Sequence, residues 1–442
     1  MRQYQNKGDF KKAYNELKKD QNNAVAFLYP ENKAYQVQTA PLNNVVITVK
    51  DVFATNDAPT RASSLILENF QPFYNATVVQ KLLDANARVV AKVNNDELAL
   101  GGTGTYSAYG LITNPRDHER FVGGSSSGSA ATMTENIGFA LGSDTGDSVR
   151  LPAAFNGLVG YKPSYGAISR YGMFAYASSL DTVAYFTHNV NDAIVAAQTL
   201  FGTDHKDMTS VDVAISNVTC SKPQKVAFLD FSPFIKPYVQ DEIQKFVAKI
   251  QDNGTQVEII QPNLEILNAI NIVYRVISFS EASSNLANLT GIGFGSRVNG
   301  ESWEEIMLNT RSQKFGKMVQ ERLALGSYFL YTENQEEIFI KAQKARRLIK
   351  NYYTELHKKY DCVLFPAYAG IAPKFDEDTS NNKVMNFILT GANLVGNPSI
   401  TIPLGMHNGM PFSFALESAI YSDEKLLGYA EYLEKLRGEI NG

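Results

Sequence analysis

Short apolar runs rich in β-branched residues alternate with amphipathic segments along this chain. The run from Asn44 to Lys50 predicts a buried strand that ends at Lys50. After a loop, the spacing of apolar residues from Asn75 onward predicts a helix with Asn75 as its N-cap and one apolar stripe, formed by Val78, Val79, Leu82 and Leu83. A strand is predicted directly afterwards at 88–93. This order of strand, loop, helix and strand is typical of a largely parallel sheet covered by helices.

The same alternation returns in the second half of the chain. A helix is predicted over 240–252, where the apolar residues share one face and Asn253-Gly254 supplies a stop signal. A strand follows at 257–260. Further elements are predicted from shorter patterns, namely a charged helix at 8–20 and strands at 224–229, 362–366 and 398–403. The pattern therefore indicates an α/β protein.

Domain boundaries are weakly marked in the sequence. The polar, irregular segment 204–223 predicts a linker or surface insertion, and the glycine-containing segment 283–315 predicts loops. We expect 283–350 to form a helical and loop-rich region on the substrate side, and residues 1–40 to form an N-terminal helical region. Because no repeat and no strong linker interrupts the chain, we expect a single domain over 1–442.

Composition excludes several classes of protein. The 442 residues are 44% hydrophobic, enough for a large core, and the net charge of −4 gives no overall attraction to nucleic acid. Cys220 and Cys362 lie far apart without a CxxC pattern, so neither a disulfide framework nor a thiolate zinc site is indicated. The polar N-terminus and the lack of a run of about 20 apolar residues lead us to expect a cytoplasmic protein without membrane association.

Two turns of small residues between Gly123 and Pro152 carry the strongest chemical signal. The first contains Ser125, Ser126 and Ser127 and precedes a segment that can start a helix. The second ends at Ser148, and consecutive backbone N–H groups there could form a nest for a developing oxyanion, contributed by Thr145, Gly146, Asp147 and Ser148. Either turn alone is more often an ordinary Gly/Ser turn. Both together, bracketing one short helix, indicate a site.

Lys50 is the candidate base for these serines. A lysine at a strand end is usually a surface residue whose ammonium reaches water. To act as a base it must lose its proton near pH 7, which requires lowering the pKa from ~10.4 by roughly 3 units, or ~4 kcal/mol. Burial among Val46, Val49 and Phe53 could supply part of that. Two serines and a lysine without a nearby histidine indicate hydrolysis of an amide by a Ser-Ser-Lys relay.

Other interpretations of the same residues are weaker. Residues 124–128 fit the G-x-S-x-G elbow of α/β-hydrolases, but a polar segment precedes them and the downstream histidines occur in polar or helix-like segments (His188, His205, His357, His407). A phosphate-binding loop would need G-x-x-x-x-G-K-[ST], which is absent from the sequence. Asp117-His118-Glu119 lacks metal-site spacing and predicts a solvated turn. Five basic residues at helical spacing predict a solvated helix face, namely Lys341, Lys344, Arg346, Arg347 and Lys350.

The motifs taken in order resemble the amidase signature family, and within it the A subunits of bacterial glutamyl-tRNA(Gln)/aspartyl-tRNA(Asn) amidotransferases. The resemblance covers about residues 40–200 and resumes at 341–350, 363–370 and 393–405. Its most specific segments are VVITVKDVF, DELALGG, NPRDHERFVGGSSSGSAA, ALGSDTGDSVRLPAAFNGLVGYKPSYGAISRYG and ASSLDTV. The resemblance implies an α/β/α fold with a mixed, twisted central sheet covered by helices on both faces.

The resemblance also implies roles for individual residues. Lys50 matches the family's base, Ser125 its bridging serine on a cis peptide bond, and Ser148 its nucleophile; the amides of 145–148 match the oxyanion hole. Three further positions match substrate-binding residues: Gly124, Arg346 for the glutamine carboxylate, and Asn386 at a position where an acidic residue is expected for the substrate ammonium. No metal and no cofactor are implied for this chain.

By the same resemblance, the chain would hydrolyse glutamine and pass ammonia to a partner B subunit. There, ATP and Mg²⁺ would activate Glu-tRNA(Gln), or Asp-tRNA(Asn), for amidation, and a small C subunit would clamp the two larger ones. Charged tRNA would be bound through the partner, and no membrane is involved.

Departures from the family pattern leave other functions open. Asp147 stands where the family usually has glycine, Asn386 replaces an acidic residue, and Ala415 stands where a glutamine is expected. We predict that the Asp147 carboxylate faces away from Lys50, because a close carboxylate would favour the charged lysine. A stand-alone amidase acting on another carboxamide and a catalytically degenerate assembly subunit remain the alternatives.

Overall fold

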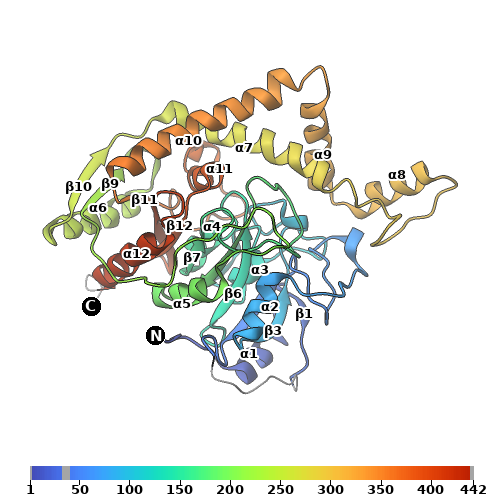
Figure 1. The fold of residues 1–442 in the computed structure, drawn as a ribbon, viewed down its shortest axis with the longest axis horizontal. Helices are drawn as coiled ribbons and strands as arrows, with labels where there is room; N and C mark the ends of the chain where they lie inside the picture. Colours follow the sequence, from blue (N-terminus) through green and yellow to red (C-terminus); the bar gives the residue numbers. More distant parts are fainter. Residues whose placement is uncertain (1, 32–39, 439–442) are drawn as a thin grey trace.

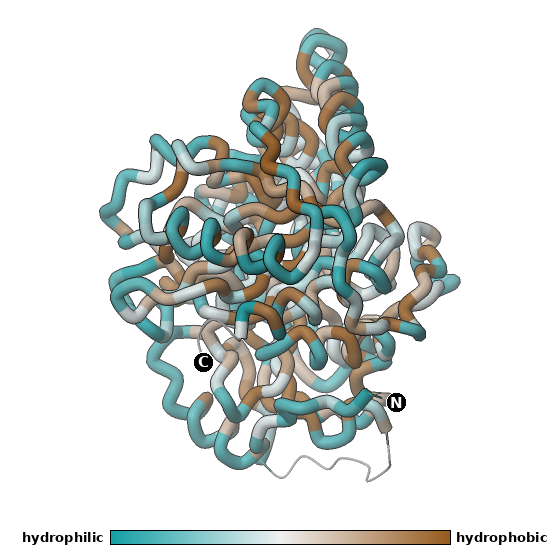
Figure 2. The backbone as a smooth tube through the Cα atoms, turned by 90° about the vertical axis from the view of Figure 1, so that its left-hand side faces the viewer, coloured by the Kyte–Doolittle hydropathy of each residue, from teal (hydrophilic) through white to brown (hydrophobic). Residues whose placement is uncertain are grey.

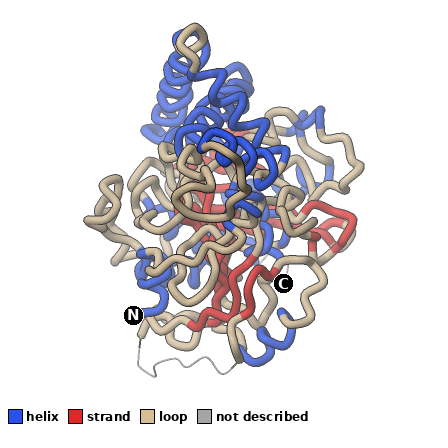
Figure 3. The backbone as a smooth tube through the Cα atoms, turned by 90° about the vertical axis from the view of Figure 1, so that its right-hand side faces the viewer, coloured by secondary structure: helices blue, strands red, loops and turns tan. Residues whose placement is uncertain are grey.

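An eleven-stranded mixed sheet forms the centre of the computed structural model, which describes residues 2–31 and 40–438. Figure 3 shows the strands in the middle of the molecule, with helices gathered above them and loops around them. From one edge to the other, the strands are β1 (Val25–Leu28), β3 (Arg88–Val93), β2 (Val46–Lys50), β6 (Phe139–Asp144), β8 (Thr182–Thr187), β7 (Val159–Lys162), β12 (Ser399–His407), β13 (Met410–Glu417), β11 (Cys362–Pro366), β9 (Lys225–Leu229) and β10 (Gln256–Ile260).

The direction of the strands changes across the sheet. On one side β2 runs parallel to β3 and β6, and on the other β9 runs parallel to β10 and β11. Between them β8, β7, β12 and β13 pair antiparallel. The expectation of a largely parallel sheet therefore holds only for the two flanks, and the mixed sheet that the resemblance implies is confirmed.

Helices cover both faces of the sheet (Figure 1). One group contacts the sheet through α5, α6 and α12, with α2 packed on α5; another contacts it through α3, α4 and α10, with α7 and α11 packed on α10. The helices are α1 (Phe10–Leu17), α2 (Thr77–Asp84), α3 (Ser127–Ala131), α4 (Arg150–Asn156), α5 (Val190–Leu200), α6 (Pro237–Asp252), α7 (Leu264–Asn285), α8 (Trp303–Lys314), α9 (Lys317–Leu330), α10 (Lys341–Lys359), α11 (Gly391–Val395) and α12 (Asp423–Gly438).

Shorter elements complete the description. A two-stranded sheet pairs β4 (Thr113–Asn114) with β5 (Asp117–Phe121). Single helical turns occur at η1 (Leu65–Leu67), η2 (Glu97–Ala99), η3 (Ser232–Phe234), η4 (Glu336–Ile340, a π-helical turn), η5 (Ser380–Asn382) and η6 (Ile388–Thr390).

The segment 283–315 is more helical than predicted. α7 continues to Asn285, and α8 begins at Trp303 because the Ser302 side chain accepts a hydrogen bond from the backbone N–H of Glu305. The glycines that suggested loops occupy only 291–300. α9 and α10 both pack on α7, and α8 projects furthest from the sheet (Figure 1).

Three further expectations need correction. The N-terminal region is not purely helical, since β1 pairs antiparallel with β3; residues 32–39 of that region, like Met1 and 439–442 of the predicted domain, lie outside the described residues. α2 starts one residue after Ala76, and Asn75 accepts a hydrogen bond from Asn56 instead of capping the helix. α6 begins at Pro237, because proline is well accommodated in the first helical turn. The segment 204–223, predicted to be a linker or surface insertion, contains no helix or strand.

The interior of the sheet is strongly apolar, which fixes the strands that carry the polar site residues. Every residue of β2, β6, β7 and β8 is buried. In Figure 2 hydrophobic stretches concentrate inside the molecule while many outer turns are hydrophilic. Among the described residues, no helix is both long and apolar enough to cross a lipid bilayer.

Candidate active site

Lys50 ends β2 in the centre of the molecule with its side chain fully buried. Its Nζ donates hydrogen bonds to three serine hydroxyls: 2.8 Å to Ser125 Oγ, 2.9 Å to Ser143 Oγ and 3.0 Å to Ser126 Oγ. Burial lowers the pKa of Lys50 to about 7, although the charges of Asp96, Asp144 and Asp181 oppose that shift. Near pH 7 about half of the lysine is therefore neutral, and the neutral amine can accept the proton of Ser125 across the 2.8 Å contact.

The first serine turn is held against the loop that follows η2. The peptide bond between Gly124 and Ser125 is cis, as the resemblance implies. Position 124 requires glycine, since a Cβ there would lie 2.1 Å from a carboxylate oxygen of Asp96 and 2.8 Å from the backbone nitrogen of Thr103. The N–H of Asp96 donates to the carbonyl of Ser125 at 3.1 Å, and the N–H of Gly124 donates to the carbonyl of Gly102 at 3.0 Å. These contacts orient Ser125 toward Lys50.

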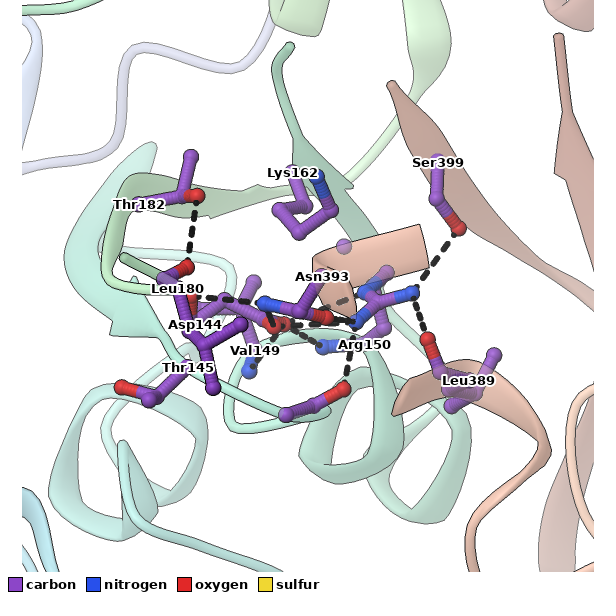
Figure 4. Close-up of polar contacts among 12 residues, drawn as sticks. Asp144, Thr145, Val149, Arg150, Lys162, Leu180, Thr182, Leu389, Asn393 and Ser399 are labelled. Atoms are coloured by element: carbon purple, nitrogen blue, oxygen red, sulfur yellow. Dashed lines mark hydrogen bonds and ion pairs between the residues drawn. The ribbon is translucent and has the colours of Figure 1, made fainter. Parts of the chain in front are cut away.

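The second turn joins β6 to α4 and is held by a buried ion pair (Figure 4). The Asp144 carboxylate accepts hydrogen bonds from the N–H of Val149 at 3.0 Å and from two guanidinium nitrogens of Arg150 at 2.9 and 3.1 Å. Arg150 also donates to the carbonyl of Gly146 at 2.7 Å. Three contacts tie this guanidinium to the C-terminal part of the chain, through Leu389, Asn393 and Ser399.

In the backbone around Ser148, carbonyl groups accept hydrogen bonds from the protein, while the N–H groups of 145–148 donate none to the described residues. The carbonyl of Ser148 accepts from the N–H of Ser126 at 3.1 Å, and that of Asp147 accepts from Leu151 at 2.9 Å. Within the described residues, the N–H groups of 145–148 have no hydrogen-bond acceptor. Free N–H groups beside a buried serine are the donors that an oxyanion requires.

A cavity of about 350 Å³ opens over this turn. Its lining includes Gly102, which contacts Gly124, and Asp147, which directly precedes Ser148. The other lining residues are Gly101, Thr103, Tyr106, Phe121, Leu151, Phe155, Tyr274, Arg275, Phe279, Arg322, Tyr368, Pro373, Thr379, Asn386, Phe387 and Thr390. The volume suits a small molecule of amino-acid size.

A family model described as Amidase matches residues 2–427. The chain belongs to the amidase family. The A subunit of glutamyl-tRNA(Gln) amidotransferase from Natranaerobius thermophilus is 35% identical over 439 residues, which cover 97% of this chain and 89% of that protein. The corresponding protein of Heliobacterium modesticaldum, which carries the same name, is 38% identical over 413 residues, covering 90% and 84%.

Solved structures agree with this assignment. The crystal structure of the A subunit of glutamyl-tRNA(Gln) amidotransferase from Thermotoga maritima superposes with a TM-score of 0.79 at 30% identity, covering 97% of this chain and 95% of that one. The peptide amidase of Stenotrophomonas maltophilia, at 24% identity and a TM-score of 0.80, shares the fold. The resemblance of the motifs to the amidase family is thus confirmed.

The structure brings together most of the residues that the motifs singled out in this amidase. Lys50 and Ser125 are in contact, and Ser126 links that turn to the backbone of Ser148. Asp147 borders the cavity, and the carboxylates whose charges raise the pKa of Lys50 most are those of Asp96, Asp144 and Asp181. Asn386 also borders the cavity, where its side-chain amide donates to the carbonyl of Thr379 at 3.2 Å.

Arg346 is placed differently from what the resemblance implies. Its guanidinium donates to the carbonyl of Leu394 at 2.7 Å and to the side chain and carbonyl of Ser179 at 2.8 and 3.0 Å, and it is not among the described residues that line the cavity. It also departs from the predicted solvated helix face, because it is half-buried while Lys341, Lys344 and Arg347 are exposed. Ala415 is buried in β13, where it pairs with Phe365 and Thr401.

The weaker interpretations gain no support from the structure. Residues 124–128 follow the partly exposed hairpin strand β5, whereas a hydrolase elbow follows a buried strand. Asp117 forms an ion pair with Arg120 and Glu119 forms one with Lys374. Across the described ranges, no group of three His, Cys, Asp or Glu side chains is arranged to hold a metal ion.

Several residues around the site received no individual role from the sequence. Ser126 and Ser143 contact Lys50, Asp96 holds the first turn, and Arg150 holds the second. All four lie inside the motifs that carry the family resemblance, so the signal was present without a physical role attached to it. Arg322 lies on α9, far from those motifs in sequence, and only the fold places it at the cavity.

Proposed function

We propose that this chain is the glutamine-hydrolysing subunit of a tRNA-dependent amidotransferase. The observation that carries the proposal is the contact of 2.8 Å between Lys50 Nζ and Ser125 Oγ, next to the turn that presents Ser148. A neutral lysine is a competent base for a hydroxyl, and the pKa of Lys50, lowered to about 7 by burial, supports that role. Relatives that are 35 to 38% identical over most of the chain are named as A subunits of glutamyl-tRNA(Gln) amidotransferase.

In the proposed mechanism the two serines and the lysine act as one relay. Neutral Lys50 takes the proton of Ser125 as Ser125 takes that of Ser148, and Ser148 Oγ forms a bond to the carboxamide carbon of glutamine. The N–H groups of 145–148 stabilise the negative oxygen that results. The proton returns through Ser125 to the departing nitrogen, which leaves as ammonia when the C–N bond breaks. Water then hydrolyses the ester between glutamate and Ser148, releasing glutamate.

The ammonia would be used by a partner. The names of the relatives, which are those of one component of an amidotransferase, support a multi-subunit complex. We propose that a B subunit uses ATP and Mg²⁺ to activate and amidate Glu-tRNA(Gln), that a C subunit stabilises the pair, and that Asp-tRNA(Asn) is the alternative acceptor. The net charge of −4 of this chain is consistent with tRNA binding through the partner.

The test is ammonia release from glutamine by the chain assembled with its B and C partners. Ser148→Ala should abolish release, because it removes the attacking oxygen. Ser127→Ala is the matched control, since Ser127 lies in the first turn and its hydroxyl is directed to the carbonyl of Ser125, 3.5 Å away, and not to Lys50. It should keep activity within a few-fold of wild type.

Three outcomes separate the functions. Release from glutamine that depends on Ser148 supports the proposal. Hydrolysis of other amides without hydrolysis of glutamine identifies a stand-alone amidase. Partner binding without hydrolysis of any amide identifies an assembly subunit.

A further inference from the structure

Three charged side chains line the cavity, and they differ in how many hydrogen-bond and ion-pair partners the protein provides for them. Among the described lining residues, Asp147 is the one carboxylate, and Arg275 and Arg322 are the cations. The Asp147 carboxylate is half-buried and has no hydrogen-bond or ion-pair partner within the described part of the chain. A carboxylate kept partly from water without a donor is unfavourable unless a ligand supplies one.

Arg322 and Arg275 are not equivalent. Arg322 is half-buried, with its guanidinium carbon 5.0 Å from the centre of the Phe279 ring and one nitrogen 3.3 Å from the Tyr176 hydroxyl. These contacts leave most of its five N–H donors available. Arg275 is exposed, and its guanidinium carbon lies 5.7 Å from the centre of the Phe387 ring. Arg322 is thus the cation whose position the protein fixes.

Tyr274 lines the same cavity as Asp147 and Arg322. Its ring would be 3.1 Å from a Cβ added at Gly146, the residue before Asp147. Burial raises the pKa of Tyr274 well above 10, and the charges of Arg322 and Asp147 both act on it, in opposite directions. The carboxylate and the guanidinium thus line one cavity of about 350 Å³ that includes Asp147, the residue before Ser148.

The surroundings of Asp147 allow a bound cation to change the ionisation of its carboxyl group. Burial and the neighbouring charge of Asp144 raise the pKa of Asp147 to about 7, while Arg150 opposes the shift. An ammonium group bound there would favour the ionised carboxylate and form a charge-assisted hydrogen bond. Asp147 lines the cavity and directly precedes Ser148, so an amide that enters from this cavity and reacts at Ser148 passes beside the Asp147 carboxylate.

We propose that Asp147 binds the α-ammonium group and Arg322 the α-carboxylate of an amino-acid amide whose carboxamide reacts at Ser148. The inference rests on the proposed function, and it assigns to these residues the recognition of glutamine as a zwitterion. It explains how this chain selects an amino acid although position 386 carries a neutral asparagine committed to Thr379 and Arg346 is bound to Ser179 and Leu394.

The test compares two amides in the assembled complex. Glutaramate keeps the carboxylate and carboxamide of glutamine and has hydrogen in place of the ammonium. Wild type should prefer glutamine over glutaramate by 10- to 100-fold in kcat/KM, the range of one charge-assisted hydrogen bond. Asp147→Asn should reduce that ratio to within about threefold of unity, mainly through KM. Asp147→Glu, which keeps a carboxylate, should restore part of the preference. Both substrates are hydrolysed by the same variant, so damage to the turn that slows both reactions equally leaves the ratio of their kcat/KM values unchanged.

Arginine variants test the other half of the proposal. Arg322→Met should lower kcat/KM for glutamine and glutaramate alike by at least tenfold, and should not affect butanamide, which lacks both charged groups. Arg275→Met is the matched control on the same cavity and should change glutamine hydrolysis less than threefold, because an exposed cation contributes little.

Each remaining outcome decides the inference. Equal efficiency of wild type on glutamine and glutaramate, or an unchanged ratio in Asp147→Asn, overturns it while leaving glutaminase activity intact. Absence of ammonia release from glutamine by wild type contradicts the proposed function itself. If Asp147→Asn does not fold, calorimetric binding to Ser148→Ala replaces it: at least tenfold tighter binding of glutamine than of glutaramate supports the inference, and equal binding overturns it.

Discussion

The Nζ of Lys50 and the Oγ of Ser125 lie 2.8 Å apart in a region from which solvent is excluded, because both residues are fully buried. The contact joins the end of a parallel strand to a turn 75 residues further along the chain. The rate of the proposed hydrolysis should therefore depend on whether Lys50 is protonated.

Hydrolysis should therefore depend on pH through Lys50. Its pKa in the folded protein is about 7, so the neutral, reactive form is depleted below pH 7 and predominates above it. We expect kcat/KM for glutaramate, which lacks an ammonium group, to rise with pH through about 7 and then level off. Lys50→Met should reduce kcat by about 10²- to 10⁴-fold, the usual contribution of a general base. A rate independent of pH between 5 and 9 would contradict the role of Lys50.

The hydroxyl of Ser143 should tune that pH profile. It accepts a hydrogen bond from Lys50 Nζ at 2.9 Å, which stabilises the charged lysine. Ser143→Ala removes this acceptor, so the pKa of Lys50 should fall and the acidic limb should move to lower pH by up to about one unit. Ser129→Ala is the control, because the Ser129 hydroxyl is also buried but donates to the carbonyl of Leu141. An acidic limb that moves to higher pH in Ser143→Ala would be inconsistent with this account.

The sequence predicts the catalytic core better than the substrate cavity. Lys50, Ser125 and Ser148 sit on a buried strand and two small-residue turns, features that local pattern and composition determine. The cavity residues Arg322 and Asn386 come from α9 and from a loop near η5. Whether they meet at the cavity depends on how elements distant in sequence pack. Residue type alone could not tell that Arg346 would be bound by Ser179 while Arg322 borders the cavity.

The directions of the strands in the sheet are likewise only partly predictable from the sequence. The pattern of strand, helix and strand predicts the parallel flank formed by β2 and β3. The antiparallel centre depends on pairings such as β7 with β12, whose residues are more than 200 positions apart. Likewise, the helix 303–314 was hidden by nearby glycines and depends on its cap at Ser302. Local propensity is a weak guide where tertiary packing decides.

Breaking the buried ion pair that holds the turn of Ser148 should reduce the stability of the protein. Arg150 and Asp144 are 2.9 Å apart and neither side chain is exposed. Arg150→Met removes the ion-pair partner of the buried Asp144 carboxylate, which should lower the free energy of unfolding by about 3–5 kcal/mol. Lys358→Met is the control, because it removes a surface ion pair of 2.7 Å between Lys358 and Glu355. These two side chains are 63% and 61% exposed, so the free energy of unfolding should fall by less than about 1 kcal/mol. Urea unfolding of both variants measures the difference, and similar losses would refute this ranking.

Asp204 should make a contribution to stability that disappears in acid. Its Oδ2 accepts hydrogen bonds of 2.6 Å from the hydroxyls of Thr77 and Ser169, and so ties the start of the 204–223 segment to α2 and to the loop after β7. Burial alone would raise the pKa of Asp204, but the two hydroxyl donors and the N–H of Lys206 lower it to about 2. A folded-state pKa below the unfolded value of about 3.9 means that the ionised carboxylate stabilises the fold.

The sign of the pH effect follows from that relation. The stabilisation is complete above about pH 4–5, where the unfolded state is also ionised, and is lost as pH falls through 2. Asp204→Asn should therefore lower the free energy of unfolding by about 1–2 kcal/mol at pH 7, and its difference from wild type should narrow between pH 4 and pH 2. Asp252→Asn, an exposed residue at the end of α6, is the control and should change stability little at either pH. A deficit of Asp204→Asn that stays constant down to pH 2 would show that packing, not the charge, carries the contribution of Asp204.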